Sequence, residues 1–153
     1  MARYAMKVRT AKSPADAFAY MADLSNFVLW DPGVIGATQA IGDTPDLGSA
    51  YDVEVKRIGG SMTLRYELTE FEPPHRFVAR AESDKLTSVD IITVEADEVG
   101  DDEEGSVVTY DAELSLNGAI AIGDPALQLA FNNIGDKAAA GLIRALDGVR
   151  VEV

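Results

Sequence analysis

Apolar and polar positions recur in two ways along this chain, and the longest regular pattern lies near its C-terminal end. From Asp124 to about Asp147, apolar residues return every three or four positions, which is the spacing of one helix face. These residues are Leu127, Phe131, Ile134, Ala138, Leu142 and Leu146. Asp124 can cap the helix, Pro125 fits its first turn, and Gly148 suits a left-handed stop. We therefore predict a helix over this span that turns its apolar stripe toward the rest of the chain.

The predicted helix carries many residues with small side chains or none. It is rich in alanine and glycine, including Gly135 and Gly141, although glycine inside a helix costs about 1 kcal/mol relative to alanine. Such small residues either let a sheet approach the helix closely or leave space beneath it. Close approach is the commoner reason, and both interpretations stay open from the sequence alone.

Most of the preceding chain alternates with a period of two, as half-buried strands do. The expected strands cover residues 3–10, 34–41, 51–57, 62–69, 76–82, 86–96 and 106–116. Ser13-Pro14 marks the start of one short helix after the first strand, and a second short helix runs from Ser25 to Trp30. Tight turns such as Gly59-Gly60 join successive strands, so we expect antiparallel pairing.

The order of these elements predicts a single α+β domain spanning residues 1–153. Each strand has one polar face, so the other face of the sheet is the one that a helix has to cover. We expect a curved antiparallel sheet of six or seven strands, two short helices after the first strand, and the long C-terminal helix packed on the concave face. A sheet curled around a helix with so many small residues can enclose a cavity.

Composition and charge exclude several classes of function. The chain has no cysteine and one histidine, so we predict no metal site, no cofactor, and no Ser-His-Asp or Cys-His catalytic arrangement. The 26 acidic and 13 basic residues give a formal net charge of −13, which opposes binding to nucleic acid or to anionic membranes. No apolar run is long enough to span a membrane, and the first residues lack a secretory signal, so we expect a cytoplasmic protein.

Several short motifs follow one another in a recognisable order. They are Ser13-Pro14 before the first helix, Trp30-Asp31-Pro32-Gly33-Val34, Gly48 with Tyr51, Tyr66 followed by Phe71-Glu72-Pro73-Pro74, Gly105 before residues 107–110, and Gly141-Leu142 in the last helix. With these motifs the chain resembles the START-like, or helix-grip, superfamily and, within it, the bacterial polyketide cyclase/dehydrase and lipid-transport group. The resemblance implies a hydrophobic pocket between the sheet and the long helix, entered near the short helices and hairpin tips. It implies no single reaction, because members include carriers, cyclases and partners of other proteins.

Asp90 is the candidate for proton transfer. It shares the parity of Leu86, Ile92 and Val94, which form the more apolar face of their predicted strand. A carboxylate that points into an apolar pocket has a raised pKa, which suits general acid–base catalysis. Arg57 lies on the inward parity of its own strand and can pair with this carboxylate. The alternative is that a bulge shifts the register and leaves Asp90 in solvent.

The other candidate ligand contacts are aromatic or apolar residues on the predicted inner faces. Together with Arg57 and Asp90 they are Phe27, Trp30, Tyr51, Tyr66, Leu68, Tyr110, Leu127, Phe131 and Ile134. Trp30 can stack on a flat ligand or fill the core beneath its short helix. Tyr66 and Tyr110 can orient a ligand oxygen through their hydroxyls, or bond to the backbone as core tyrosines do.

Three functions are compatible with the sequence. The leading hypothesis is a monomer or homodimer that binds a hydrophobic small molecule, such as a lipid, a polyketide or an aromatic compound, as a carrier, sensor or storage protein. The second is a cyclase or dehydratase in which a pocket aspartate or tyrosine moves a proton. The third is an interaction module whose sheet or acidic surface meets another protein.

Overall fold

The computed structural model describes residues 1–57, 59–98, 104–117 and 124–153. Its elements in chain order are β1 (Ala2–Thr10), α1 (Pro14–Ala22), the 3₁₀ turn η1 (Leu24–Asn26), α2 (Phe27–Trp30), β2 (Val34–Ile41), β3 (Ala50–Arg57), β4 (Gly60–Glu72), β5 (Arg76–Glu82), β6 (Leu86–Glu98), β7 (Glu104–Leu116), α3 (Asp124–Ala145) and β8 (Val149–Val151). The α+β order is the predicted one, with one strand more than expected. β8 has only three residues, which is too short for a period-two pattern to be recognised.

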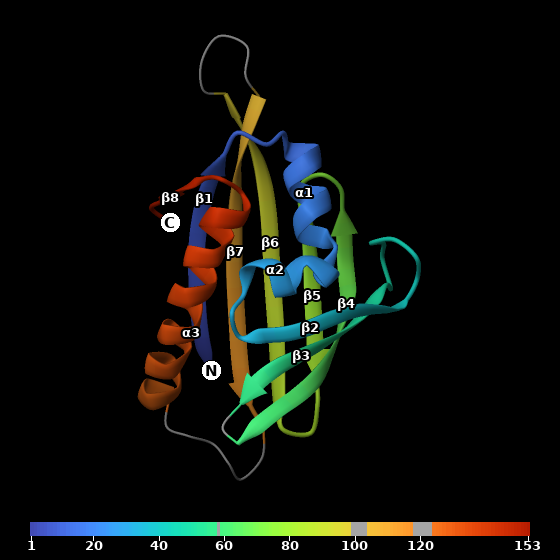
Figure 1. The fold of residues 1–153 in the computed structure, drawn as a ribbon, viewed down its shortest axis with the longest axis vertical. Helices are drawn as coiled ribbons and strands as arrows, with labels where there is room; N and C mark the ends of the chain where they lie inside the picture. The colour runs from blue at the N-terminus through green and yellow to red at the C-terminus, as the bar shows by residue number, and fades with distance from the viewer. Residues whose placement is uncertain (58, 99–103, 118–123) are drawn as a thin grey trace.

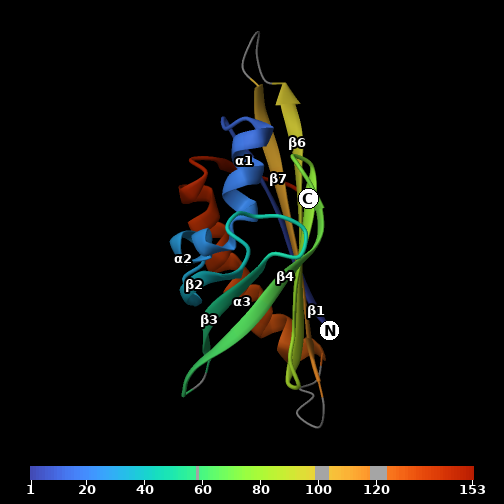
Figure 2. The same cartoon turned by 90° about the vertical axis from the view of Figure 1, so that its right-hand side faces the viewer.

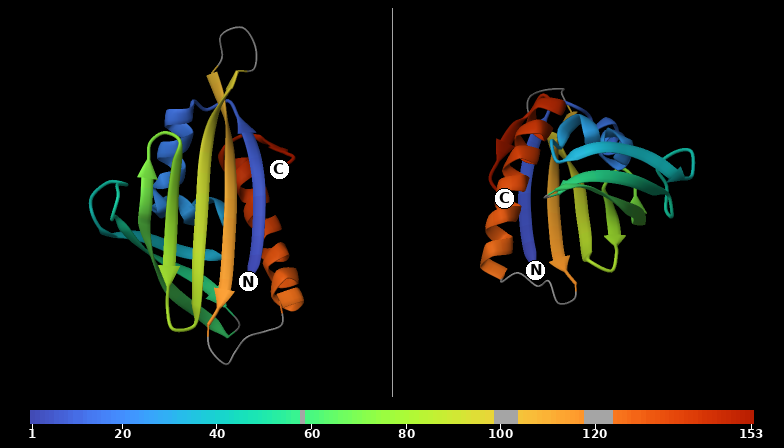
Figure 3. Two further views of the ribbon diagram at one scale, coloured as in Figure 1. Left: turned by 180° about the vertical axis from the view of Figure 1, so that it is seen from behind. Right: turned by 60° about the horizontal axis from the view of Figure 1, so that its bottom comes forward.

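The strands form one antiparallel sheet in the order β2-β3-β4-β5-β6-β7-β1-β8. β1 lies beside β7, with Ala2 opposite Leu114 and Thr10 opposite Ser106, so the first strand extends the sheet beyond the last long one. The sheet curls so that β2 and β3 fold over toward the helices (Figures 1 and 2). The opposite, convex face carries none of the described helices (Figure 3).

The helices all lie on the concave face and share it between them. α3 packs along β1, α1 contacts β6 and β7, and α2 lies between α3 and β2 (Figure 1). The long helix therefore covers the concave face on its β1 side, while the short helices cover the middle. None of the described helices combines the length and apolar character that a membrane crossing requires.

The predicted helix signals are confirmed at α1 and revised at the end of α3. The Ser13 side chain accepts a hydrogen bond from the backbone N–H of Asp16, which caps α1 as its sequence predicts. At the end of α3 the residue in the left-handed conformation is Asp147, with a φ of 48°, and not Gly148. Gly148 is needed for another reason, because a Cβ there would collide with the Arg9 carbonyl oxygen of β1. The side chain of Asp124, the predicted cap of α3, lies outside the described residues.

The small residues of α3 serve close packing. A Cβ on Gly135 would collide with the Tyr4 ring of β1, and a Cβ on Gly141 would collide with the Trp30 carbonyl oxygen of α2. Glycine therefore lets the helix lie against both elements, which supports the close-approach interpretation. The same contact corrects the predicted stripe: Gly135 takes the buried position, and Ile134 is turned outward with half of its surface exposed.

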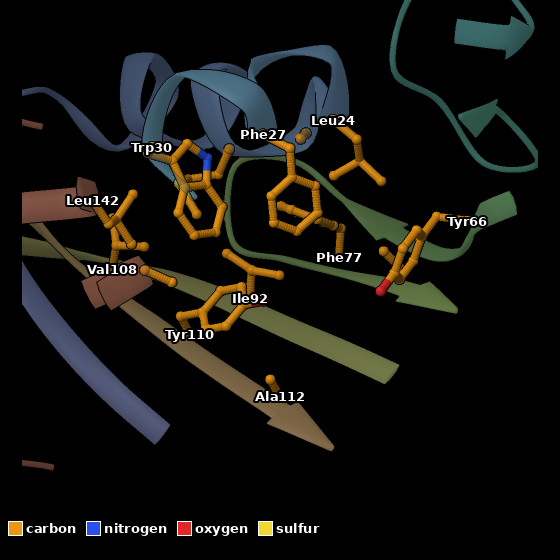
Figure 4. Close-up of a cluster of buried hydrophobic side chains, with 14 of the residues drawn as sticks. Leu24, Phe27, Trp30, Tyr66, Phe77, Ile92, Val108, Tyr110, Ala112 and Leu142 are labelled. Atoms are coloured by element: carbon orange, nitrogen blue, oxygen red, sulfur yellow. The ribbon is translucent and has the colours of Figure 1, made fainter. Parts of the chain in front are cut away.

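The core between the sheet and the short helices contains several aromatic rings that contact one another (Figure 4). Phe27 stacks on Trp30 at 4.7 Å between ring centroids, and Trp30 meets the edge of Tyr110 at 5.4 Å. Phe18 of α1 meets Phe77 of β5 edge-on at 5.5 Å. Trp30 therefore fills the core beneath its helix, and this part of the concave face is closely packed.

Candidate ligand-binding site

Asp90 points into the protein from the middle of β6. Its backbone pairs with Ala79 of β5 and Ala112 of β7, and both registers run through this position without a shift. The residue is buried, with 3% of its surface exposed. The solvent-exposed alternative for Asp90 is therefore excluded, and the two alanines beside it leave its carboxylate in apolar surroundings.

Burial dominates the chemistry of this carboxyl. The pKa of Asp90 is raised to about 7, chiefly because burial removes its solvation. Hydrogen bonding by Tyr110 lowers this pKa and the negative charge of Asp31 raises it, both to a smaller extent. Burial likewise raises the pKa of the Tyr110 hydroxyl well above its usual value. At neutral pH the site thus combines a carboxyl that readily gains and loses a proton with a phenol that stays protonated.

A pair of hydroxyl groups lies on the neighbouring part of the concave face. The Tyr66 hydroxyl of β4 and the Ser88 hydroxyl of β6 are 2.7 Å apart and hydrogen-bonded, and both residues are buried. Burial raises the pKa of Tyr66, and the charge of Asp90 adds to that effect. Ser88 lies two residues before Asp90 on the same strand, so both pairs face the same interior. We call Tyr66, Ser88, Asp90 and Tyr110 the polar cluster.

Asp31 adds a second carboxylate near the polar cluster. It follows α2, and its Oδ1 accepts a hydrogen bond of 2.9 Å from the backbone N–H of Gly33. Burial raises its pKa, and its charge raises the pKa values of Tyr66, Asp90 and Tyr110. In the sequence, Asp31 stands out only as part of a family motif. An acid directly after a buried tryptophan and before Pro-Gly is a signal that could have marked it.

Tyr51 contributes an unsatisfied hydroxyl. The residue is fully buried on β3 opposite Tyr66, and its hydroxyl has no hydrogen-bond partner among the described residues. Burial raises its pKa to about 12, with a smaller contribution from the charge of Asp23. A buried polar group without a partner costs about 1–3 kcal/mol, so this hydroxyl is available for a polar group brought in by a ligand.

Arg57 does not pair with Asp90. It lies exposed at the end of β3 opposite Gly60, whereas Asp90 lies level with Ala79 and Leu68. The separation along β4 from residue 60 to residue 68 corresponds to about 26 Å at the rise of a strand. Alternation assigns Arg57 to a face of its strand, but it contains no information about the level of the residue along the sheet.

The remaining predicted contacts divide into buried and half-exposed residues. Phe27, Leu68 and Leu127 are buried, Phe131 is half-buried, and Ile134 faces outward. Phe131 belongs to a group of apolar residues that are only partly covered. The group also contains Val55 of β3, Met62 of β4 and Leu86 of β6. We call these four residues the open apolar end.

The open apolar end lies beyond the polar cluster on the same concave face. Met62 and Leu86 each lie four residues from a member of the polar cluster on the same strand, Met62 from Tyr66 and Leu86 from Asp90, and Val55 pairs with Met62. Side chains four residues apart on a strand point to the same face. The concave wall is therefore closed by aromatic rings at one end, polar in the middle and incompletely covered at the other end.

A separate apolar groove lies beside α1. It has a volume of about 490 Å³ and is lined by Ala15, Phe18, Ala19, Ala22, Asp23, Pro45, Phe71, Pro73 and Pro74. None of the predicted contact residues and no member of the polar cluster lines it. The polar cluster and this groove are therefore different features of the molecule, and the candidate site is placed at the cluster because the chemical groups are there.

A curved sheet that packs around one long helix, with two short helices after the first strand, is the START-like fold. Several solved structures share this fold. The START superfamily protein of Mycobacterium smegmatis matches with a TM-score of 0.72 at 12% identity, over 95% of this chain and 97% of that one. XoxI of Bacillus cereus matches with a TM-score of 0.68 at 15% identity, over 95% of this chain and 96% of that one. Ginseng major latex-like protein 151 from Panax ginseng matches with a TM-score of 0.64 at 12% identity, over 94% of this chain and 96% of that one.

The family follows from the sequence itself. Residues 1–147 match the model of the family described as polyketide cyclase/dehydrase and lipid transport. The chain belongs to this family, as its motifs predicted. No curated protein sequence matches the chain significantly.

Proposed function

We propose that the protein binds a hydrophobic small molecule on its concave face, with the polar part of the molecule at the polar cluster and its apolar part over the open apolar end. It would act as a carrier, sensor or storage protein. The observation that carries the proposal is a set of buried hydroxyl and carboxyl groups, among them the hydrogen-bonded Tyr66–Ser88 pair, in a largely apolar wall. Small-molecule sites commonly have this composition, in which a few polar groups fix the orientation within an apolar lining.

The partly covered residues supply the driving force. Val55, Met62, Leu86 and Phe131 are apolar and face the interior side of the fold, yet each keeps part of its surface exposed. A ligand that covers them gains about 25 cal/mol for each Å² of apolar surface removed from water. The family, whose description includes lipid transport, is in accord with this use of the concave face.

Titration with Nile red, an uncharged fluorescent dye, tests the proposal. We expect saturable binding that an unlabelled hydrophobic compound displaces, and native mass spectrometry of protein purified from its own cells should then reveal a co-purifying molecule. Lack of saturable dye binding, combined with a mass that matches the bare chain, would rule out the proposed function.

A second candidate function is an acid–base enzyme of the cyclase or dehydratase type. It is favoured by one observation, the pKa of Asp90, which lies at about 7 and suits a group that both accepts and donates a proton. Tyr110 lies diagonally across from Asp90, stays protonated because burial raises its pKa, and can stabilise charge on a substrate oxygen. Once a substrate is identified, Asp90→Asn should lower kcat by at least 100-fold, and unchanged turnover would remove Asp90 from the mechanism.

A further inference from the structure

The buried polar groups of the protein are acids and hydroxyls. Among the described residues, the buried polar side chains belong to Thr10, Ser49, Ser88, Asp90 and Ser106, and the partly buried Asp31 adds a second carboxylate. Lysine, arginine and histidine do not occur in this set. The interior of the described part therefore offers no positive charge to a ligand.

The arginines that form ion pairs lie at the protein surface, away from the polar cluster. The pairs are Arg3–Asp111, Arg9–Asp97, Arg65–Asp52, Arg76–Glu70 and Arg80–Glu82, and in each the arginine side chain is substantially exposed. Two of the described cations have inward parity. Arg150 lies opposite Val8 on the edge strand β8, two strands from β7, and is exposed with its guanidinium over the Tyr4 ring. Arg57 lies exposed at the far end of β3, about eight residues along the neighbouring strand from the level of Asp90. It cannot reach a ligand group that sits at the polar cluster.

We propose that the molecule bound on the concave face is uncharged at its polar end and carries a keto or hydroxyl oxygen there, so that fatty acids and other anionic amphiphiles are excluded. This inference rests on the proposed function and narrows its ligand. An anionic head at the polar cluster would lose its hydration beside two carboxyl groups, and no described cation would compensate it. A keto or hydroxyl oxygen avoids this cost because it enters without a charge.

The hydroxyl groups can satisfy such an oxygen. The Tyr66–Ser88 pair can donate in either direction, so one of its hydroxyls can turn toward a ligand acceptor. The Tyr51 hydroxyl has no partner among the described residues and lies on the strand next to Tyr66. A protonated carboxyl at Asp90 adds another donor, which is how a neutral carboxylic acid can hold a substrate oxygen in a dry site.

Displacement of Nile red by ten-carbon compounds that differ only in the head group tests the inference. Decan-1-ol and decan-2-one should displace the dye at concentrations at least 10-fold lower than decanoate at pH 6. The gap should widen at pH 8, because Asp90 then carries its charge beside Asp31, with Tyr66 and Tyr110 still neutral. Decanoate that matches decan-1-ol at both pH values would overturn the inference while leaving hydrophobic binding in place.

Substitutions locate the effect. Asp90→Asn should reduce the difference between decan-1-ol and decanoate several-fold at pH 8. Asp111→Asn, which removes the same charge from a half-buried residue paired with exposed Arg3 on the adjacent strand, should leave it unchanged. The pH comparison on the unaltered protein needs no substitution, so it decides the question even if Asp90→Asn folds poorly.

The remaining outcomes are equally decisive. Tight decanoate binding that Arg57→Ala abolishes would overturn the inference by placing an anionic head at the rim. Preference for decylamine over decan-1-ol at pH 8 would overturn it by making the two acids a cation site. Absence of any Nile red binding would instead remove the proposed function, and the inference with it.

Discussion

Asp90 of β6 and Tyr110 of β7 are diagonal neighbours on the concave face, and inside the protein each side chain shifts the pKa of the other. Asp90 lies opposite Ala112 and Tyr110 lies opposite Ile92, so the acid and the phenol have apolar residues directly across from them. Diagonal positions of this kind lie within reach of a long aromatic side chain. The concave wall thereby contains a carboxyl that can exchange its proton near neutral pH.

The pH dependence of stability should report the burial of Asp90. Its pKa is about 7 in the folded protein and near 3.8 when unfolded, so between these values only the folded state keeps the proton. The contribution of Asp90 to stability therefore falls as pH rises from about 4 to about 7. Asp90→Asn removes this loss, and its stability relative to the unaltered protein should rise over that range by a few kcal/mol, since one pKa unit corresponds to roughly 1.4 kcal/mol.

Urea unfolding of both proteins at pH 4.5 and pH 8 measures the difference. Asp111→Asn serves as the control, because that aspartate is bonded to exposed Arg3 and lies outside the polar cluster. A difference between Asp90→Asn and the unaltered protein that is equal at both pH values would contradict the burial of an ionisable carboxyl.

Tyr51→Phe and Tyr66→Phe should have opposite effects on stability. The Tyr51 hydroxyl is buried without a partner among the described residues, so its removal should stabilise the ligand-free protein by about 1 kcal/mol. The Tyr66 hydroxyl bonds to Ser88 at 2.7 Å, so its removal should destabilise by about 1–2 kcal/mol. Equilibrium denaturation compares the two variants directly. Destabilisation by both would mean that the Tyr51 hydroxyl does have a partner.

Gly141→Ala should destabilise the protein even though alanine is the better helix former. The added Cβ would meet the Trp30 carbonyl oxygen, and such overpacking typically costs about 1–3 kcal/mol. The gain in helix propensity is only about 1 kcal/mol. We expect a lower midpoint of thermal unfolding. Gly36→Ala is the control, because a Cβ there meets nothing within 4 Å.

Two alanine substitutions should distinguish the concave face from the groove beside α1. Ala112→Leu adds bulk next to Asp90 and should weaken Nile red binding at least several-fold. Ala19→Leu adds the same bulk to the groove of about 490 Å³ and should leave the affinity unchanged. Fluorescence titration at temperatures where both variants are folded provides the measurement. The reverse result would move the bound molecule into the groove.

The sequence was sufficient for the fold because local signals and global arrangement agree. The Ser13 cap, the period-two strands and the alanine-rich helix each reflect short-range physics that the tertiary structure preserves. Ile134 shows the limit, because its helical spacing is as good as that of its neighbours. The Tyr4 ring packing on Gly135 decides which residue is buried, and that contact joins distant parts of the chain.

Local patterns predicted only part of the site, because they contain no information about contacts between distant parts of the chain. Alternation along β6 placed Asp90 on the inner face, and the structure confirms it. Alternation does not fix a level along the strand, so Arg57 was paired with it wrongly. Asp31 became part of the site only through the folding of α2 against the sheet, which a linear pattern does not contain.

The two halves of α3 are held very unequally. Its C-terminal half is anchored by Gly141 and by buried Ala139 and Leu142, while its N-terminal half buries Leu127 but leaves Leu129 67% and Ile134 50% exposed. Opening free energies follow local burial, so backbone amides near Leu129 should exchange with deuterium much sooner than those near Leu142. We therefore expect the N-terminal half of α3 to shift when molecules of different size bind on the concave face, while the strands beneath it keep their positions.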